Sequence, residues 1–431
     1  MGTKLERIAE ISAQSKRPIF TSLYHLIDAD LLKQCHNELD GKKAVGIDGV
    51  TKEEYGKELE SNIANLVERL INKAYKPLPT RRVFIPKANG KLRPLGILAY
   101  EDKIVQLALK KVLEAIYEPR FLNSMYGFRP KRGCHEAIKE VYHHISEGKI
   151  RYVVDADIKG FFDHIDHDWM IKFLEWHVKD PNILWLVMKY LKAGVMVNGE
   201  FEDTAEGTIQ GGNVSPTLAN VYMHNVLTLW FKLEFCKEVH GDCFLVNYAD
   251  DFIAGFQYKA DAELFYEKLK ERVRKFNLEL EESKSRLIEF GRHAVQNRAA
   301  RRQGKPETFD FLGFTFFMGK TRKGYPWPKL KTSRKKFEKS LKSFKEWLFA
   351  NKEQPAKLLV SQLNVKLTGY YRYYGVSFNG PKLSAFLHRV QQFLYKVMNR
   401  RGCRRTYTWD GFVTMLKAYP LAKPKIYYAL H

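Results

Sequence analysis

The sequence predicts an α+β fold, in which helical regions precede and follow an antiparallel sheet. Apolar residues recur at helical spacing before residue 80 and after residue 320. Between these regions, short runs of β-branched and aromatic residues alternate with turn residues, which is typical of strands. Positive charge gathers near the end, because residues 320–431 hold 25 Lys and Arg against 4 Asp and Glu. We therefore expect a basic, all-helical C-terminal region.

The composition indicates a globular protein with a polyanionic partner. The chain has 431 residues, of which 45% are hydrophobic and 13% aromatic, enough for two or three packed domains. Its net charge of +23 favours nucleic acid as the partner. A basic protein without a partner is the alternative, but the uneven placement of the charge speaks against it. No apolar run is long enough to cross a membrane, and the N-terminus resembles no targeting signal, so we expect a cytoplasmic bacterial protein.

The cysteines argue against two kinds of scaffold. Five are present, and no two of them form a Cys-x-x-Cys pair, which argues against a zinc-supported finger. An odd and scattered set also argues against a disulfide framework and fits a reducing compartment. The positions are Cys35, Cys134, Cys236, Cys243 and Cys403.

The N-terminal third is predicted to be helical and to lead into a hairpin. Residues 1–80 place apolar side chains at helical spacing, interrupted by a turn-rich link at 42–51. Residues 81–98 are predicted to form a β-hairpin whose turn is Ala88-Asn89-Gly90. A helix is expected at 101–117.

The central part is predicted to carry the sheet. We expect strands at Tyr152–Asp157, Phe244–Tyr248, Phe252–Phe256 and Phe309–Phe317, and helices from about His167, from about Ser215 and over 261–276. The second and third strands form a hairpin with Ala249-Asp250-Asp251 at its tip. The region 291–308 is polar and basic from Gly291 to Pro306 and is predicted to be an exposed loop.

The C-terminal region is predicted to bind nucleic acid. Residues 333–348 place apolar side chains on one helical face and mostly lysines elsewhere, which favours a phosphate-facing helix over an ordinary solvated face. Residues 369–375 interleave tyrosines with an arginine and could stack on nucleotides, although core tyrosines are an equal alternative. The predicted contacts are Lys335, Lys339, Lys342, Lys345, Tyr370, Arg372, Tyr373, Arg400, Arg401, Arg404 and Arg405.

Two acidic clusters at predicted strand ends point to catalysis. One is Asp155-Ala156-Asp157 and the other is Asp250-Asp251. Nucleotidyl transfer uses two divalent metal ions, and Mg²⁺ prefers carboxylate oxygens. Asp28-Ala29-Asp30 repeats the pattern in a helical region and is interpreted as surface. The cluster at 164–168 is interpreted as a polar turn with Asp166 or Asp168 at a helix N-cap.

With these clusters in place, the chain resembles group II intron reverse transcriptases across most of its length. The resemblance rests on seven blocks in the family's order: Arg82–Ile97, Ser124–Pro130 (S-x-G-F-R-P), Asp155–Asp163, Gly207–Asn220 (close to G-T-P-Q-G-G-x-x-S-P-L-L-A-N), Tyr248–Asp251 (Y-A-D-D), Ser283–Arg286 and Phe311–Phe314. Ile209 and Thr217 depart from the pattern at positions without chemistry. No H-N-H nuclease segment precedes the end at His431, so an endonuclease-less form is expected.

The resemblance implies a right-hand polymerase that copies RNA into DNA. Residues 1–80 would be an N-terminal extension, 81–319 the fingers and an antiparallel palm sheet, and 320–431 a basic thumb and maturase domain. It implies two Mg²⁺ ions, with Mn²⁺ as a substitute, and an RNA template, a DNA or RNA primer and dNTPs. It also implies binding of intron RNA and help with its splicing. The sequence sets no oligomeric state.

The resemblance also assigns roles to single residues. Asp157, Asp250 and Asp251 would hold the metal ions. Asp157 is preferred to Asp155 because it precedes Phe162 by five residues, and Phe162 would select deoxynucleotides, whereas Phe161 is expected to be core. Further implied contacts are Lys87 and Arg93 to the triphosphate, Gln210 and Gly211 to nucleotide and template, Lys284 to the leaving pyrophosphate, and Arg129 to nucleic acid.

Three other functions remain open at this point. A reverse transcriptase domesticated for phage defence, spacer acquisition or repair would keep the same chemistry. An RNA-binding maturase with an inactive polymerase site would not, but the complete acidic motifs speak against it. A structural RNA chaperone would bind RNA without depending on any aspartate.

Overall fold

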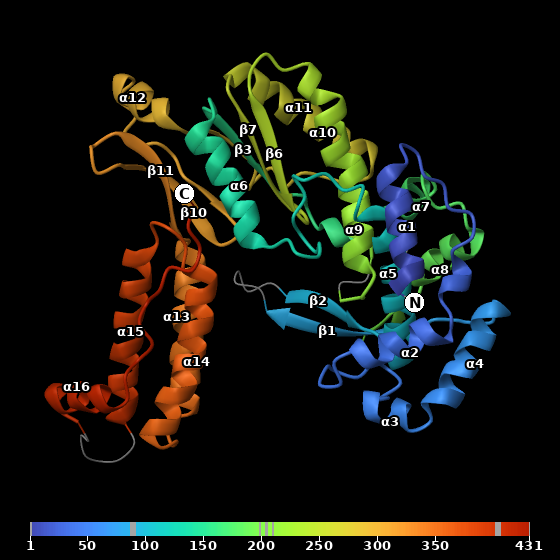
Figure 1. The fold of residues 1–431 in the computed structure, drawn as a ribbon. Coiled ribbons are helices and arrows are strands. Elements are labelled where there is room, and N and C mark those ends of the chain that lie inside the picture. Colours follow the sequence, from blue (N-terminus) through green and yellow to red (C-terminus); the bar gives the residue numbers. More distant parts are fainter. Residues whose placement is uncertain are drawn as a thin grey trace. The chain divides into compact units, whose positions relative to one another are not determined.

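A computed structural model describes residues 2–86, 92–197, 200–202, 206–208, 211–400 and 407–430 (Figure 1). The chain divides into two compact units. The first comprises 1–137, 154–254 and 260–286, and the second comprises 138–153, 255–259 and 287–431. Helices and largely antiparallel sheets together confirm the predicted α+β class. Among the described residues, no helix is long and apolar enough to cross a membrane.

The N-terminal region is helical, as predicted. Its helices are α1 (Gly2–Gln14), the short 3₁₀ turn η1 (Tyr24–Leu26), α2 (Ala29–Glu38), α3 (Lys52–Lys57) and α4 (Leu59–Ile71). Local capping fixes their starts, since the Asp28 side chain accepts from the backbone N–H of Leu31, and Thr51 and Glu54 form a capping box. Asp28 therefore has a structural role at the surface, which confirms the interpretation of its Asp-Ala-Asp pattern.

The turn-rich link at 42–51 packs against the start of α5 (Tyr100–Tyr117). A Cβ on Gly46 would lie 2.5 Å from the backbone of Ala99, so only glycine allows this approach. The Asp48 carboxylate accepts from the backbone N–H of Tyr100 at 3.0 Å and stabilises the helix N-terminus. The predicted helix at 101–117 is confirmed within one residue.

A buried carboxyl lies on α5 among tyrosines. Asp102 is 2% exposed, and it accepts from the Tyr75 hydroxyl and, at 3.0 Å, from the backbone N–H of Leu78. The Tyr75 hydroxyl also lies 2.6 Å from that of Tyr190. Burial raises the pKa of Asp102 to about 7, despite the two hydrogen bonds that favour its charged form.

We expect Asp102 to make the protein less stable as pH rises from 5 to 8. The folded-state pKa of about 7 lies above the roughly 3.9 of an unfolded aspartate, so the folded state holds the proton more tightly. This contribution is fully present below pH ~4 and is lost as pH rises through 7. The measurement compares thermal midpoints of wild type and Asp102→Asn between pH 5 and 8. The variant should show the flatter profile, and parallel profiles would contradict the assignment.

The predicted hairpin at 81–98 is confirmed. β1 (Thr80–Pro86) pairs antiparallel with β2 (Leu92–Ile97), so that Val83 faces Leu95. Two short strands, β4 (Val195–Val197) and β5 (Glu200–Glu202), extend the sheet in the order β2-β1-β4-β5. The predicted turn at 88–90 lies outside the described residues.

A second four-stranded sheet has the order β6-β7-β3-β8. Its strands are β3 (Tyr152–Ala156), β6 (Cys243–Tyr248), β7 (Asp251–Phe256) and β8 (Arg286–Glu289), which confirms the three strands predicted before residue 260. The remaining helices of this region are α6 (Cys134–Glu147), η2 (Phe161–Asp163), α7 (His167–Leu174), α8 (Pro181–Leu191), α9 (Ser215–Met223), the π-helical η3 (His224–Thr228), α10 (Leu229–Leu233), η4 (Phe235–Lys237) and α11 (Lys259–Lys275). Asp166 caps α7 by accepting from the backbone N–H of Trp169, as predicted.

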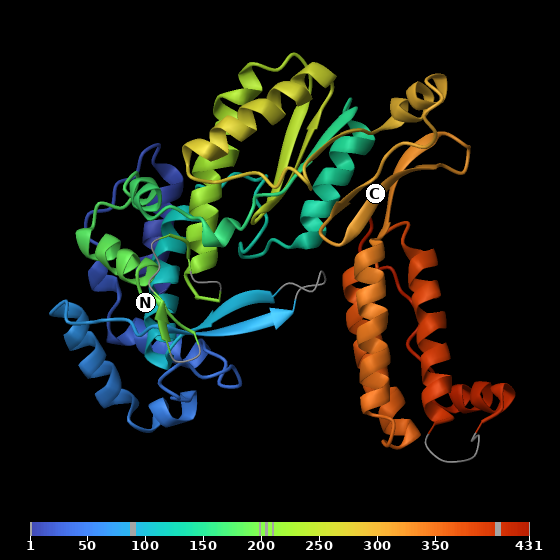
Figure 2. The same cartoon turned by 180° about the vertical axis from the view of Figure 1, so that it is seen from behind.

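Three predictions about the chain after residue 290 were wrong. Residues 292–300 form the helix α12 (Arg292–Ala300) rather than a loop, because alanine, arginine and glutamine favour helix despite their exposed setting. Residues 309–317 form two strands, β9 (Phe309–Phe311) and β10 (Phe314–Lys320), joined where Leu312 and Gly313 adopt φ of 47° and 84°. The region after 320 is not all helical, since β11 (Pro326–Thr332) pairs with β10 (Figure 2).

Four helices complete the second unit: α13 (Arg334–Ala350), α14 (Ala356–Tyr374), α15 (Gly380–Met398) and α16 (Trp409–Ala418). The first three lie side by side (Figure 1). α13 buries the predicted apolar face, which consists of Phe337, Leu341, Phe344 and Leu348. The apolar period of 3.6 residues therefore identified the buried face correctly.

Candidate functional site

The two acidic clusters meet at one edge of the second sheet. Asp157 follows the last residue of β3, and Asp250 and Asp251 stand at the turn from β6 into β7. β3 and β7 are neighbours in this sheet, and the backbone N–H of Arg151, just before β3, donates at 2.9 Å to the carbonyl of Phe256, the last residue of β7, so the two strands run antiparallel. The end of β3, which Asp157 follows, therefore lies beside the start of β7 at Asp251. The structure thus brings together acids that lie almost a hundred residues apart in sequence.

A lysine from a third segment binds the first of these acids. The Lys284 Nζ lies 2.5 Å from Asp157 Oδ2, and the backbone N–H of Glu281 donates to the Asp157 carbonyl at 2.8 Å. The hydrogen bond to Asp157 raises the pKa of Lys284, and the charges of Glu281 and Asp251 act in the same direction. The pKa of Lys284 therefore responds to acids from both clusters.

Asp155 and Asp157 have different surroundings, although both are half-buried. Asp155 pairs with Arg286 at 3.3 Å, whereas Asp157 pairs with Lys284. Successive residues of a strand point to opposite faces, so residues 155 and 157 share one face. Their partners Lys284 and Arg286 are also two residues apart and follow the same alternation. Lys284, whose pKa also responds to Asp251, links Asp157 to the second cluster, which agrees with the preference for Asp157.

The donor chemistry of these acids suits a hard divalent cation. Carboxylate oxygens are the ligands that Mg²⁺ prefers, together with water and substrate oxygens. Within the described part of the chain, no three His, Cys, Asp or Glu side chains are gathered closely enough to hold a metal ion. The Lys284 ammonium instead provides the positive charge beside Asp157. A metal ion at Asp157 would therefore have to displace this ammonium.

Contacts of backbone groups and side-chain amides support the turn that carries Asp250 and Asp251. Ala249, within the turn, has φ of 57°. The Asn247 side chain donates to the Ala249 carbonyl at 2.6 Å, and the Asn220 side chain of α9 donates to the Gly127 carbonyl at 2.8 Å. A Cβ on Gly127 would lie 2.4 Å from the Ala249 nitrogen. Gly127 and Asn220 each belong to a block of the sequence resemblance, but the sequence alone gave them no role here.

The structure gives Arg129 partners within the fold. Its side chain is 4% exposed and pairs with Glu118 at 2.8 Å. It also donates to the carbonyls of Leu122 and Met125 at 2.7 and 2.9 Å. A guanidinium has five donors in a fixed fork, and these contacts engage all three of its nitrogens from within the fold. Arg129 therefore organises the 118–129 turn, and its contact with nucleic acid stays a prediction that these internal contacts do not support.

Phe162 borders a cavity of about 130 Å³. It is 7% exposed, whereas Phe161 is 2% exposed and belongs to the core, as predicted. The cavity is lined by Thr80, Arg82, Pro94, Leu95, Gly96, Phe162, Asp163, Leu191, Val195, Glu206, Gly207 and Thr208. Gly207 has φ of 88°, and a Cβ there would lie 2.7 Å from the carbonyl oxygen of Asp163. Glycine is required at this wall of the cavity.

Gly211 approaches protein backbone closely. Its φ is 112°, and a Cβ would lie 2.6 Å from the Gly96 carbonyl of β2. The close approach predicted for this glycine thus exists within the fold, whereas its approach to nucleotide and template stays a prediction. Lys87 and Gln210 lie outside the described residues. The Arg93 backbone pairs with Ile85 in the hairpin, and its side chain is not described.

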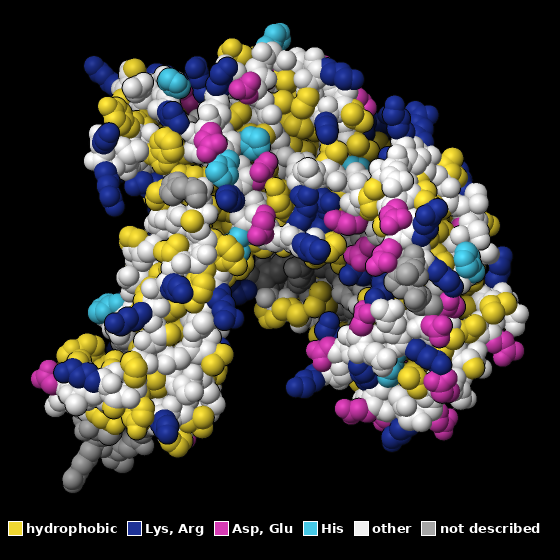
Figure 3. Space-filling model, in the orientation of Figure 1, with side chains coloured by type: hydrophobic (Ala, Val, Ile, Leu, Met, Phe, Trp, Pro, Cys, Tyr) yellow, Lys and Arg dark blue, Asp and Glu magenta, His cyan; other side chains and the backbone are white. Residues whose placement is uncertain are grey.

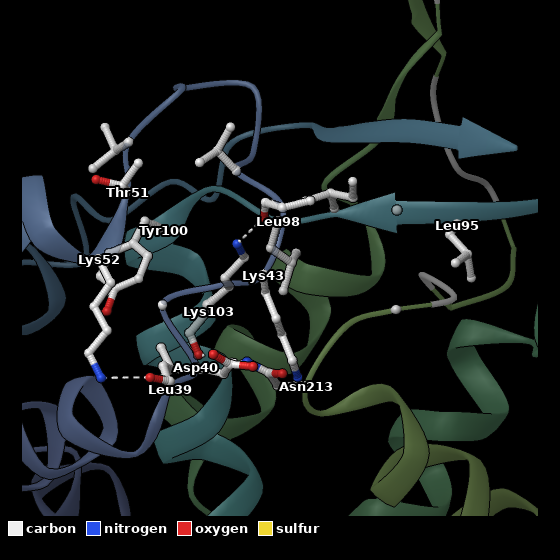
Figure 4. A pocket seen from close by; sticks show the side chains of 17 residues that line it. Leu39, Asp40, Lys43, Thr51, Lys52, Leu95, Leu98, Tyr100, Lys103 and Asn213 are labelled. Carbon is white, nitrogen blue, oxygen red and sulfur yellow. Dashed lines mark hydrogen bonds between the residues drawn. The ribbon is translucent and has the colours of Figure 1, made fainter. Parts of the chain in front are cut away.

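A second cavity, of about 310 Å³, lies between the 39–52 segment and β2 (Figure 4). Gly211 and Asn213 form part of its wall. Two lysines at its border are engaged by backbone carbonyls, since Lys103 donates to Ala44 at 2.7 Å and Lys52 donates to Leu39 at 2.6 Å. Residues of the N-terminal link and of the loop that carries Gly211 therefore line the same cavity.

The predicted nucleic-acid contacts of the second unit differ in exposure. Lys335, Lys339, Lys342 and Lys345 are exposed on α13, and only few acids accompany the Lys and Arg side chains of α13–α15 on the face in Figure 3. Tyr370 is 7% exposed and stacks on Phe386 with 3.7 Å between ring centroids, which favours the core alternative that the sequence left open. Arg372 and Arg400 are exposed, and Tyr373 is half-buried with its hydroxyl donating to the Leu312 carbonyl. Arg401, Arg404 and Arg405 lie outside the described residues.

Known proteins from bacteria and from a yeast are similar to parts of this chain. The chain is 38% identical over 238 residues to the group II intron-encoded protein LtrA of Lactococcus lactis, which covers 54% of this chain and 39% of LtrA. It is 39% identical over 187 residues to protein YkfC of Escherichia coli, covering 43% of this chain and 49% of YkfC. It is 33% identical over 228 residues to a 91 kDa protein in the cob intron of Schizosaccharomyces pombe, covering 52% and 28%. The chain thus spans half or less of the length of these relatives.

A family model extends across both acidic clusters. The model described as reverse transcriptase (RNA-dependent DNA polymerase) matches residues 85–316, more than half of the chain. This range includes the β1–β2 hairpin, Asp157, the turn with Asp250 and Asp251, and Lys284. The chain therefore belongs to the reverse transcriptase (RNA-dependent DNA polymerase) family.

Proposed function

We propose that this protein is an RNA-directed DNA polymerase of the group II intron type. The observation that supports the proposal is the antiparallel arrangement of β3 and β7, which brings the end of β3, followed by Asp157, beside the turn with Asp250 and Asp251 within the matched range. Paired carboxylates on adjacent strand ends repel one another unless a cation compensates them. Lys284 provides such a charge beside Asp157 in this structure, and in a polymerase site bound metal ions would take its place.

Asp157, Asp250 and Asp251 would hold two Mg²⁺ ions, with Mn²⁺ as a substitute. When bound, the two ions would activate the primer 3′-hydroxyl and bind the triphosphate. Lys284, held beside Asp157, would move to the departing pyrophosphate and neutralise it, because the incoming cations compete for the same carboxylate. Lys87 and Arg93 would contact the triphosphate, and Gln210 and Gly211 would contact nucleotide and template.

The proposed partners are an RNA template, a DNA or RNA primer, dNTPs and a structured intron RNA whose splicing the protein assists. Relatives that are named for introns support the intron RNA. We assign residues 1–80 to an N-terminal extension, 81–319 to fingers and palm, and 320–431 to a thumb and maturase domain. The exposed lysines of α13 support RNA binding by the last of these.

Primer extension on an RNA template tests the proposed function. Purified full-length protein, dNTPs and Mg²⁺ should extend a primer annealed to RNA, and EDTA should abolish the product. A DNA template and ribonucleotides serve as comparisons. If the protein binds intron RNA and promotes its splicing but extends no primer, the site is a relic and the protein is a maturase alone. If it binds RNA but does neither, an RNA chaperone is the better description.

Phe162 is expected to exclude ribonucleotides. Its ring borders the small cavity, so removal would make room for a 2′-hydroxyl. A steric change of this size is worth roughly 1–3 kcal/mol, or about 10- to 200-fold. We expect Phe162→Ala to lower the preference for dNTPs over NTPs by about 10-fold or more in single-nucleotide insertion. Phe161→Ala, which truncates the adjacent core residue, is the matched control. An equal loss of dNTP preference in both variants would mean that loosened packing causes it.

The α13 lysines are expected to set the salt dependence of RNA binding. Each phosphate contact contributes a slope of about −0.7 to −0.9 in a plot of log affinity against log salt. Replacing Lys335, Lys339, Lys342 and Lys345 together with glutamine should reduce the slope by about 2 to 4. Four exposed lysines of the first unit, Lys16, Lys57, Lys73 and Lys237, provide a control with the same charge change. An unchanged slope would remove α13 from the RNA-binding surface.

A further inference from the structure

Two cysteines of the first unit face each other outside the acidic site. Cys236 lies in η4, and Cys243 is the first residue of β6. Their sulfur atoms are 3.3 Å apart, and both residues are half-buried. Both thiols are free in this structure. A disulfide bond is ~2.05 Å long, so the sulfurs would need to approach by about one ångström.

The backbone between the two cysteines is held in place from α11. The carboxylate of Asp261, 2% exposed, accepts from the backbone N–H groups of His240 and Gly241 at 3.2 and 3.1 Å. The His240 ring lies 3.3 Å from the same carboxylate. This anchored turn keeps the ends of the 236–243 segment together, so the contact between the thiols does not depend on a flexible loop.

The pKa values of the two thiols shift in opposite directions. The hydrogen bond from Cys243 lowers the pKa of the Cys236 thiol. The pKa of the Cys243 thiol is raised by the same hydrogen bond and by burial, and the negative charges of Asp261 and Asp242 add to this. The thiolate is the nucleophile in thiol–disulfide exchange. Cys236 would therefore react first and Cys243 second.

We propose that Cys236 and Cys243 are a redox-modification site that closes to a reversible disulfide with a small-molecule disulfide as the oxidant. With oxidised glutathione, the Cys236 thiolate attacks one sulfur, forms a mixed disulfide and releases one glutathione thiolate. Cys243 then loses its proton, attacks Cys236 Sγ and releases the second. Two protein thiols are oxidised, one glutathione disulfide is reduced, and the two protons pass to the glutathione thiolates. The bond would fix the N-terminal end of β6, the strand that leads to the Asp250 turn.

This inference is independent of the proposed polymerase function, and peptide mapping tests it directly. Full-length protein is incubated with oxidised glutathione, its remaining thiols are alkylated, and it is digested with trypsin. Cleavage after Lys232, Lys237 and Lys259 separates the cysteines, so the peptides 233–237 and 238–259 remain joined only if the disulfide has formed. We expect this joined species to dominate and dithiothreitol to separate it.

Two serine variants test the order of reaction. Cys243→Ser should accumulate one glutathione adduct on Cys236, because no second thiol resolves it. Cys236→Ser should react much more slowly. Cys35 is the internal control, since burial raises the pKa of its thiol to about 12 and it should stay reduced. Glutathione adducts on both cysteines without the joined peptides, or joining through another cysteine, would overturn the proposal.

The thermal midpoint is a second measurement, and it does not depend on the tryptic digest. A disulfide that closes a short loop stabilises the native state mainly by restricting the unfolded chain. Oxidation should raise the thermal midpoint of the wild type by about 2 °C or more, and dithiothreitol should reverse the shift. Neither serine variant should show it. An oxidised protein with the joined peptides but a lower midpoint would mean that the bond distorts the fold, which would overturn the proposal that the geometry is prepared for it.

Discussion

Replacing Asp250 and Asp251 with asparagine is expected to lower primer extension by at least about 1000-fold. The two metal ions of nucleotidyl transfer contribute several kcal/mol to the transition state, and each ~1.4 kcal/mol corresponds to a factor of ten in rate. Asparagine keeps the size and shape of the side chain but removes the charge that would bind the ions. The measurement is single-turnover extension of a primer on an RNA template at saturating dNTP.

The same variant should bind RNA at least as well as the wild type, because two negative charges are removed from a protein that binds a polyanion. A matched control replaces the exposed Asp30 and Glu68 of α2 and α4 by asparagine and glutamine, which changes the net charge equally. This control should extend primers at the wild-type rate. Loss of extension in both proteins would point to charge or stability, and residual activity in the Asp250/Asp251 variant within tenfold of wild type would exclude these residues as metal ligands.

The elements with a strong local pattern were predictable from sequence. The α13 face follows the 3.6-residue period, and the strands around Asp157 and Asp250 follow from apolar runs that end in acids. The turn at Leu312 and Gly313 was missed because it lies inside a phenylalanine-rich run without a cluster of polar turn residues. Helix α12 was missed for the opposite reason, since its polar composition resembles a loop although its residues favour helix.

The acidic residues of the candidate site were predictable from the sequence, but the residues that contact the site were not. Motifs identify which residues carry chemistry, whereas side-chain partners depend on which segments the fold brings side by side. Nothing local in the sequence indicates that Lys284 pairs with Asp157 or that Asn220 holds Gly127. Arg129 shows the converse, since an arginine in a basic protein suggests a phosphate contact, and only the fold reveals Glu118 beside it. Burial cannot be read from residue type alone.

Gly127→Ala is expected to disable the acidic turn without unfolding the protein. The missing Cβ would lie 2.4 Å from the Ala249 nitrogen and 2.9 Å from the Tyr248 carbonyl carbon. Both are backbone atoms, so no side chain can rotate away and one of the two segments must shift. The 124–127 segment is fixed by hydrogen bonds to Asn247 and by Asn220. The turn therefore moves, and Asp250 and Asp251 move with it.

A displacement of about 1 Å at reacting groups costs roughly 100-fold in rate, and we expect a loss of this size in single-turnover primer extension. Gly133→Ala is the matched control from the same region, because a Cβ there would meet only the flexible Glu136 carboxylate, at 3.0 Å. Circular dichroism and the thermal midpoint should show that both variants fold, with RNA affinity unchanged. If Gly127→Ala folds and extends primers like the Gly133→Ala control, the turn tolerates the shift, and the position of Asp250 does not depend on the packing of this glycine. A selective loss would show that the glycine contact positions the catalytic acids.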